Sequence, residues 1–168
     1  MDSFSNKDIA SEYLALKAAN DNLRERGKQW LWERFDLLCA EANRKLMLHD
    51  NQSQVQIGHQ EWRFKVGSSM MVGERLGVRH NSKTLTIEVG WPREPVHGFV
   101  PDGGLARARI GLSQNTMLEA RVIAELILKP QGQNDPAWRL ISNGKLGEQV
   151  TESHLRAYLK MILVDPED

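Results

Sequence analysis

Hydrophobic residues recur at helical spacing between Trp30 and Leu48. Successive apolar positions are four, three, four and four residues apart, which places them on one face of a helix. No proline precedes Pro92, so none interrupts this segment. Such large side chains have to be buried, and the only sizeable apolar partner is the strand-rich remainder of the chain. We therefore expect this helix to lie across the apolar face of a sheet. The stripe consists of Leu31, Phe35, Leu38, Ala42 and Leu46.

A second apolar stripe at helical spacing lies closer to the N-terminus. Poor helix formers, Asn20 to Asn22 and Gly27, separate it from the first. An unbroken helix over both stripes would be about 63 Å long at 1.5 Å per residue, whereas a compact domain of this size is only about 40 Å across. Either the helix breaks near residues 20–27, or one end projects. The two stripes are rotated by roughly 60° on an ideal helix, so we expect them to face different partners. The N-terminal stripe consists of Ile9, Tyr13, Leu16 and Leu23.

From Ser53 the hydrophobic period changes to two. Trp62, Phe64 and Val66 alternate with charged residues, which is typical of a half-buried strand. Short turn signals separate this run from further alternating runs, and this order predicts an antiparallel meander. We expect the later strands near residues 76–78, 84–91, 105–112, 117–128 and 138–142, with a polar loop at 130–136.

The run 117–128 is ambiguous. A possible capping box at its start favours a helix, whereas its alternation favours a strand. We interpret it as a strand because several of its residues are β-branched. A closing helix is predicted after Thr151, with an apolar stripe at Leu155, Tyr158, Leu159 and Ile162.

These patterns predict an α+β fold. A long helical N-terminus packs on an antiparallel sheet of six to eight strands, and a C-terminal helix follows. Residues 1–26 are interpreted as an N-terminal helix that forms a possible oligomerisation arm, and residues 27–168 as a single α+β domain.

Composition narrows the class of protein. The 168 residues carry 22 basic and 22 acidic side chains, so no net charge attracts nucleic acid or an anionic membrane. One cysteine, Cys39, excludes an internal disulfide and a cysteine-based zinc site. The N-terminus lacks a signal pattern, and no apolar run approaches the length of a membrane span. We expect a cytoplasmic protein with no membrane partner.

Catalytic motifs are not evident in the sequence. We find no phosphate-binding loop, nucleophile elbow or zinc-binding helix, and Cys39 beside the core stripe is read as a buried thiol. His59 and Glu61 would share a strand face that His80 could approach, but polar residues at strand ends explain the same pattern. We assign no catalytic residue, no metal and no cofactor.

Basic residues gather in the strand region. Because Trp62 and Phe64 alternate with the charges along their own strand, we expect the aromatics and the basic side chains on opposite faces. A stacking platform for single-stranded nucleic acid needs both on one face, so we expect no specific nucleic-acid binding. The basic residues are Arg63, Lys65, Arg75, Arg79, Arg107 and Arg109.

Residues 92–104 form a long connection with three prolines and three glycines. Such loops are often functional, although a simple crossover between parts of the sheet explains it equally well. The candidate ligand-binding residues in and around it are Trp91, His97, Phe99, Arg107 and Arg109.

Two functions remain open from the sequence. The first is a cytoplasmic, non-enzymatic interaction or adaptor protein. It would be a homodimer through Ile9, Tyr13, Leu16 and Leu23, with a possible further protein partner. The alternative is a small-ligand-binding protein or enzyme, with a pocket between sheet and helix and the 92–104 loop as its lid.

Overall fold

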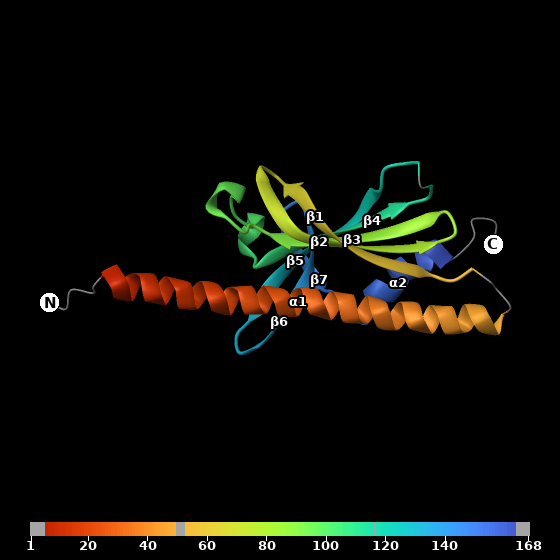
Figure 1. Ribbon diagram of the computed structural model, residues 1–168, viewed down its shortest axis with the longest axis horizontal. Helices are drawn as coiled ribbons and strands as arrows, with labels where there is room; N and C mark the ends of the chain where they lie inside the picture. Colours follow the sequence, from red (N-terminus) through yellow and green to blue (C-terminus); the bar gives the residue numbers. More distant parts are fainter. Residues whose placement is uncertain (1–5, 50–52, 116, 164–168) are drawn as a thin grey trace.

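The computed structural model describes residues 6–49, 53–115 and 117–163, which form an α+β fold (Figure 1). A long helix, α1 (Asn6–Leu48), precedes a seven-stranded antiparallel sheet, and α2 (Glu152–Leu163) closes the chain. Each strand pairs with its neighbours in sequence, so the sheet is a meander, as expected. The strands are β1 (Gln56–Val66), β2 (Ser69–His80), β3 (Lys83–Trp91), β4 (Ala106–Ser113), β5 (Arg121–Gln131), β6 (Asn134–Ser142) and β7 (Lys145–Gln149).

Helix α1 runs without a break through residues 20–27. Its 43 residues span about 65 Å, and the N-terminal part projects past the sheet (Figure 1). Of the two alternatives, a helix that breaks near residues 20–27 or one whose end projects, the structure shows the second. Gly27 is buried within the helix, where a Cβ would lie only 2.6 Å from a methyl carbon of Leu128. This glycine permits close packing of helix on sheet and does not end the helix.

The core lies between the sheet and the C-terminal half of α1. Leu31, Phe35 and Leu38 are buried there, as predicted. We call the sheet face toward α1 the helix-side face, and its opposite the outer face. The apolar helix-side residues of the central strands are buried, and the apolar stripe of α2 closes the far end of this core. The strand residues include Leu76, Val78, Leu85, Ile87, Val89, Ala108, Ile110 and Leu126, and those of α2 are Leu155, Leu159 and Ile162.

The expected separation of aromatic and basic side chains is wrong for β2 and β4. Register pairs Gln60 with Arg75 and Glu88 with Arg109, so these arginines share the outer face with Trp62 and Phe64. The guanidinium of Arg75 lies 3.9 Å from the ring centroid of Trp62, and that of Arg109 lies 4.7 Å from the ring centroid of Phe64. The alternation along β1 alone could not show which side chains of the other strands lie on the same face of the sheet.

The C-terminal strands differ from the prediction in extent. The run 117–128 does contain a strand, but β5 starts at Arg121 and continues to Gln131. The segment expected as a polar loop is mostly strand, because Pro130 falls at a register shift where a missing N–H does no harm. Strand β7 was not predicted, since most of its residues are exposed and show no alternation.

Within the described part of the chain, every helix is too short or too polar to cross a membrane.

Candidate interaction site

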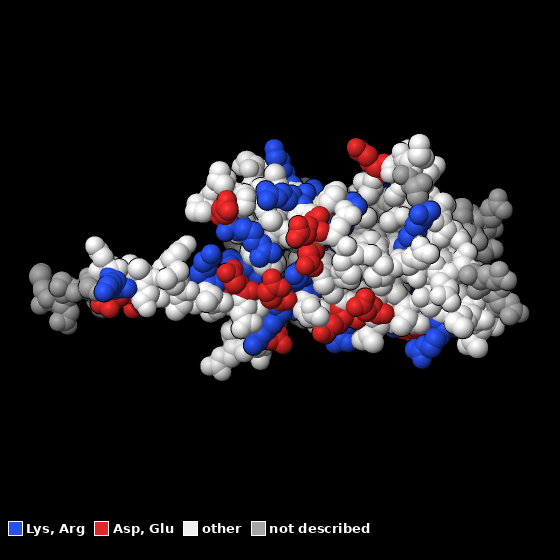
Figure 2. Space-filling model, in the orientation of Figure 1, with Lys and Arg blue, Asp and Glu red and all other residues white. Residues whose placement is uncertain are grey.

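The N-terminal part of α1 stands clear of the body. Residues 6–19 are exposed throughout, and we call them the arm (Figure 1). Three of the four predicted interface residues lie on it: Ile9, Tyr13 and Leu16 are 57%, 65% and 62% exposed. The fourth, Leu23, is partly buried against the core. Figure 2 shows a stretch of mostly uncharged surface between the tip of the arm and the body.

The arm joins the body around Arg24. Its Nε donates a hydrogen bond of 2.8 Å to the carbonyl oxygen of Leu105, and its Nη1 lies 2.8 Å from the carboxylate of Asp21. The bond to Leu105 ties the base of the arm to the body, and the ion pair with Asp21 within α1 holds the Arg24 side chain in place. The projecting stripe is therefore held in one orientation relative to the sheet.

The 92–104 loop lies beside the base of the arm and forms a groove with it. One hollow of about 370 Å³ is lined by Tyr13, Leu16 and Asn20 of α1 and by Pro92 and Pro95 of the loop, among others. A second hollow, of about 440 Å³, adjoins the first because both are lined by Arg24, Pro92 and Gly98. We call the two hollows together the arm–loop groove.

The loop adds an exposed apolar side chain to this groove. Phe99 lines the second hollow and is 69% exposed, while Val96 of the same loop is 83% exposed and lies outside both hollows. The predicted interface stripe and the 92–104 loop thus border the same groove, although they are about 80 residues apart in the sequence.

The loop is held by several polar contacts. A short 3-10 helix, η1 (Pro95–His97), is capped by the imidazole of His97, whose Nδ1 accepts backbone N–H bonds from Arg93 (3.2 Å) and Glu94 (3.0 Å). The N–H of Phe99 donates to Oγ of Ser69 at 3.3 Å. A second short helix, η2 (Pro101–Gly103), lies against Arg107, which pairs with Asp102 at 3.3 Å.

The five predicted ligand-binding residues do not converge. Trp91 is buried on the helix-side face, whereas Arg107 and Arg109 belong to the outer face. His97 is committed to its capping role, and Arg109 pairs with Glu88 at 3.0 Å. Only Phe99 lines the arm–loop groove.

A separate polar pocket of about 650 Å³ lies between α1 and strands β1 and β2. Lys28 lies 3.0 Å from Glu25 and 3.3 Å from Glu74, which also accepts a bond of 2.9 Å from the indole N–H of Trp32. Burial raises the pKa of Glu74, but Trp32 and Lys28 together outweigh burial and hold the pKa below its usual value. Figure 2 shows the charged side chains gathered where the arm meets the body.

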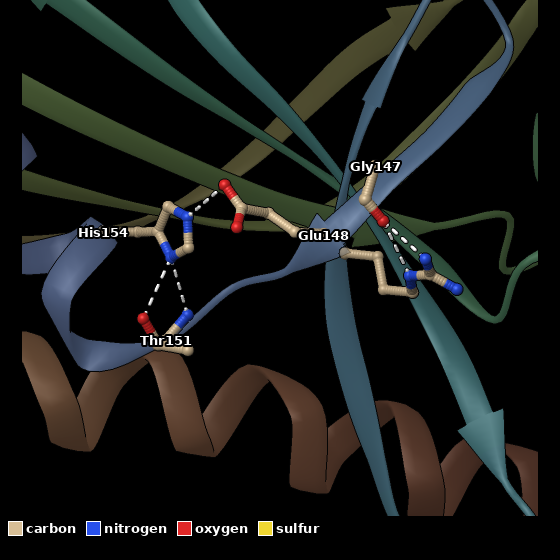
Figure 3. Close-up of polar contacts among 5 residues, drawn as sticks. Gly147, Glu148, Thr151 and His154 are labelled. Carbon is tan, nitrogen blue, oxygen red and sulfur yellow. Dashed lines mark hydrogen bonds and ion pairs between the residues drawn. The ribbon is translucent and has the colours of Figure 1, made fainter.

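A cluster at the start of α2 superficially resembles a hydrolytic triad (Figure 3). Nε2 of His154 lies 3.1 Å from Glu148, and its Nδ1 lies 3.0 Å from the hydroxyl of Thr151. However, Nδ1 also accepts the backbone N–H of Thr151 at 2.9 Å. Because that lone pair is already engaged, the imidazole acts as a helix cap and is not placed to activate the hydroxyl.

Other candidate chemical groups also have structural roles. Cys39 is buried, and burial, with a smaller effect of Asp36, raises its pKa to about 12, so it is no nucleophile at neutral pH. His59 packs edge-on against Trp32, and His80 is buried near the C-terminal end of α2. Among the residues that the structure describes, no three histidine, cysteine or acidic side chains form a metal-binding group.

Sequence reasoning found the stripe and the loop but missed that they are neighbours. The exposed Val96 was also missed, because a single apolar residue between a proline and a histidine carries no periodic signal. Comparisons with protein-family models, with curated proteins and with solved structures found no match to this chain.

Proposed function

We propose that this protein is a cytoplasmic, non-enzymatic interaction or adaptor protein that self-associates through its N-terminal arm. One observation carries the proposal: an apolar stripe lies on a helix that projects from the body and that the body does not cover. An isolated helix of about 14 residues is marginal in water, and packing of its apolar face is the usual source of its stability. A second copy is the simplest partner, since most soluble oligomers are closed and two-fold symmetric.

The polar clusters of the molecule are consistent with this proposal. His97 and His154 cap helices, Arg109 is paired with Glu88, and Cys39 is buried. These side chains serve the fold, whereas the arm and the groove offer exposed apolar surface without an evident structural role.

The proposal is tested by changing the arm alone. Leu16→Asp puts a charge on the stripe, and we expect it to convert a dimer into a folded monomer in light scattering. Leu14→Asp is the matched control, because Leu14 is 63% exposed but lies off the stripe. Deletion of residues 1–19 should give the same monomer while leaving Leu23 and Arg24 in place.

A full-length protein that is monomeric at high concentration would refute the proposal. So would a dimer that survives both Leu16→Asp and the deletion, because the contact would then lie elsewhere on the molecule.

A second candidate function, small-ligand binding, is favoured by the polar pocket between α1, β1 and β2. Its volume of about 650 Å³ is within the range of ligand sites, and Arg93 of the loop contributes to its lining. Native mass spectrometry of the protein purified from its source would show a bound small molecule if this reading holds.

A further inference from the structure

We infer that two copies pair through antiparallel arms, so that the tip of each arm lies in the arm–loop groove of the other copy. This inference rests on the proposed self-association and specifies its geometry. It predicts which residues meet and which orientation the two bodies take.

The apolar stripe of the arm lies on the side of α1 that faces the sheet. Positions 9, 13, 16, 20 and 23 are separated by four, three, four and three residues, so they share one face of the helix. Leu23, the last of them, packs against the core, and Asn20 lines the groove with the loop. The stripe therefore faces the same side of α1 as the sheet does.

This placement decides the orientation of the pair. A parallel partner helix along the stripe would continue past Leu23 into the space that the sheet occupies. In an antiparallel pair, the body of the second copy lies beyond the tip of the first copy's arm. Figure 1 shows that this end of the helix projects clear of the sheet. Antiparallel pairing is thus the arrangement that keeps the two bodies apart.

The register follows from the same spacing. In this register, Tyr13 packs against Leu16 of the second copy, and the two-fold axis passes between these two positions. The numbers of any two residues that lie opposite each other then add up to 29. Ile9 of the second copy then lies opposite Asn20. That point is the mouth of the groove, beside Pro92 and Pro95.

The area required by a stable dimer supports use of the groove. A standard interface buries about 800 Å² on each partner. A large side chain offers on the order of 150–250 Å², so three stripe residues exposed by about three fifths supply on the order of 300 Å². The exposed Phe99, which lines the second hollow of the groove, supplies further apolar surface on the side where the partner's arm tip arrives.

Cysteine cross-linking tests the orientation. The native Cys39 is buried, so introduced thiols are the reactive ones. In the antiparallel pair, Ile9→Cys combined with Asn20→Cys should yield a covalent dimer under mild oxidation, with peptide mapping showing 9–20 links. Ile9→Cys alone should not yield one, since its two copies would be about 16 Å apart along the helices.

The outcomes separate this inference from the proposed function. Self-cross-linking of Ile9→Cys alone, or a non-covalent dimer in which the double variant does not link, would overturn the antiparallel geometry but leave self-association intact. Protein that is monomeric by light scattering refutes both the geometry and the proposed function.

The contribution of the groove has its own test. Phe99→Ser should raise the dimer dissociation constant at least tenfold, because the partner's tip loses an apolar contact. Met117→Ser is the control, because Met117 is an apolar residue away from the groove that is even more exposed, at 88%, than Phe99. An unchanged dissociation constant for Phe99→Ser would show that the arms pair without the groove.

Discussion

The indole N–H of Trp138 donates a hydrogen bond of 2.8 Å to the backbone carbonyl of Gly27, 111 residues earlier in the chain. At the same point the side chain of Leu128 closes over the glycine, so that an added Cβ would lie 2.6 Å away. Helix α1 and strands β5 and β6 thus meet around a residue without a side chain. Gly27, a residue with low helix propensity, is thus a point of close contact between the helix and the sheet.

Gly27→Ala should therefore destabilise the protein. Alanine improves helix propensity by about 1 kcal/mol, but forcing a methyl group into a filled core costs about 1–3 kcal/mol. We expect a lower free energy of unfolding in urea. Ala40→Gly, on the exposed side of α1, measures the propensity effect alone. In a double-mutant cycle with Leu128→Ala, the double variant should lose less than the sum of the two single variants; strict additivity would remove the steric explanation.

The core helix offers a matched pair of leucines. Leu38 is 2% exposed and its neighbour Leu37 is 58% exposed. Leu38→Ala and Phe35→Ala should each lower the free energy of unfolding by about 2–5 kcal/mol, whereas Leu37→Ala should change it by less than about 0.5 kcal/mol. Equal effects of the two leucine variants in chemical denaturation would contradict the packing described for α1.

Cys39 should be unreactive in the folded protein. Its pKa is raised to about 12 by burial, so almost no thiolate is present at pH 8. A chromogenic disulfide reagent should detect no thiol in the native protein, and one thiol per chain after addition of denaturant. Rapid native reaction would mean that this part of α1 opens readily.

Stability should fall in acid partly through Glu74. Its folded-state pKa is lowered by the indole of Trp32 and by Lys28, against the opposing effect of burial. A lowered folded-state pKa gives stability that is fully present above the unfolded-state value, about 4.3. That stability is lost as the pH falls through the folded-state value.

Glu74→Gln keeps an acceptor for Trp32 but removes this titration. Its free energy of unfolding should therefore depend less steeply on pH below about 5 than that of the wild type. Glu33→Gln, at an exposed position of α1, serves as the control. Parallel pH profiles for the wild type and Glu74→Gln would exclude the proposed linkage.

Oligonucleotide binding should be weak despite the arginines and aromatics on the outer face. The ring of Trp62 is covered by Arg75 and its indole N–H donates to Glu88, while Phe64 is buried. Phe64 is therefore not free to stack on a base, and one face of the Trp62 ring is already occupied. Fluorescence titrations should show only low affinity that decreases steeply with salt; submicromolar, sequence-dependent binding at physiological salt would overturn this expectation.

Helices and strands were predictable from the sequence where only one face of the element is buried. The stripe from Leu31 to Leu46 and the alternation around Trp62 follow directly from burial of one face, and the structure confirms both a helix and a strand. Strand β7 lacks a buried face, so its sequence carries no such signal.

What the sequence could not supply were relationships between elements. Gly27 favours a break by its propensity, and only the approach of Leu128 explains it inside a helix. The shared face of Trp62 and Arg75 depends on strand register, and the arm–loop groove depends on where a loop 80 residues away returns. Local periodicity contains neither kind of information.

The sequential strand order has a consequence for how the chain acquires its structure during synthesis. Every strand pairs with the one made just before it, so the sheet can grow in the order of translation, with short loops to close at each step. Helix α1 is made first, yet its contacts with Leu128 and Trp138 become available only after most of the sheet has emerged. Until then its large apolar residues lack their partners in the sheet, and transiently exposed apolar surface of this kind makes an incompletely folded chain prone to aggregation.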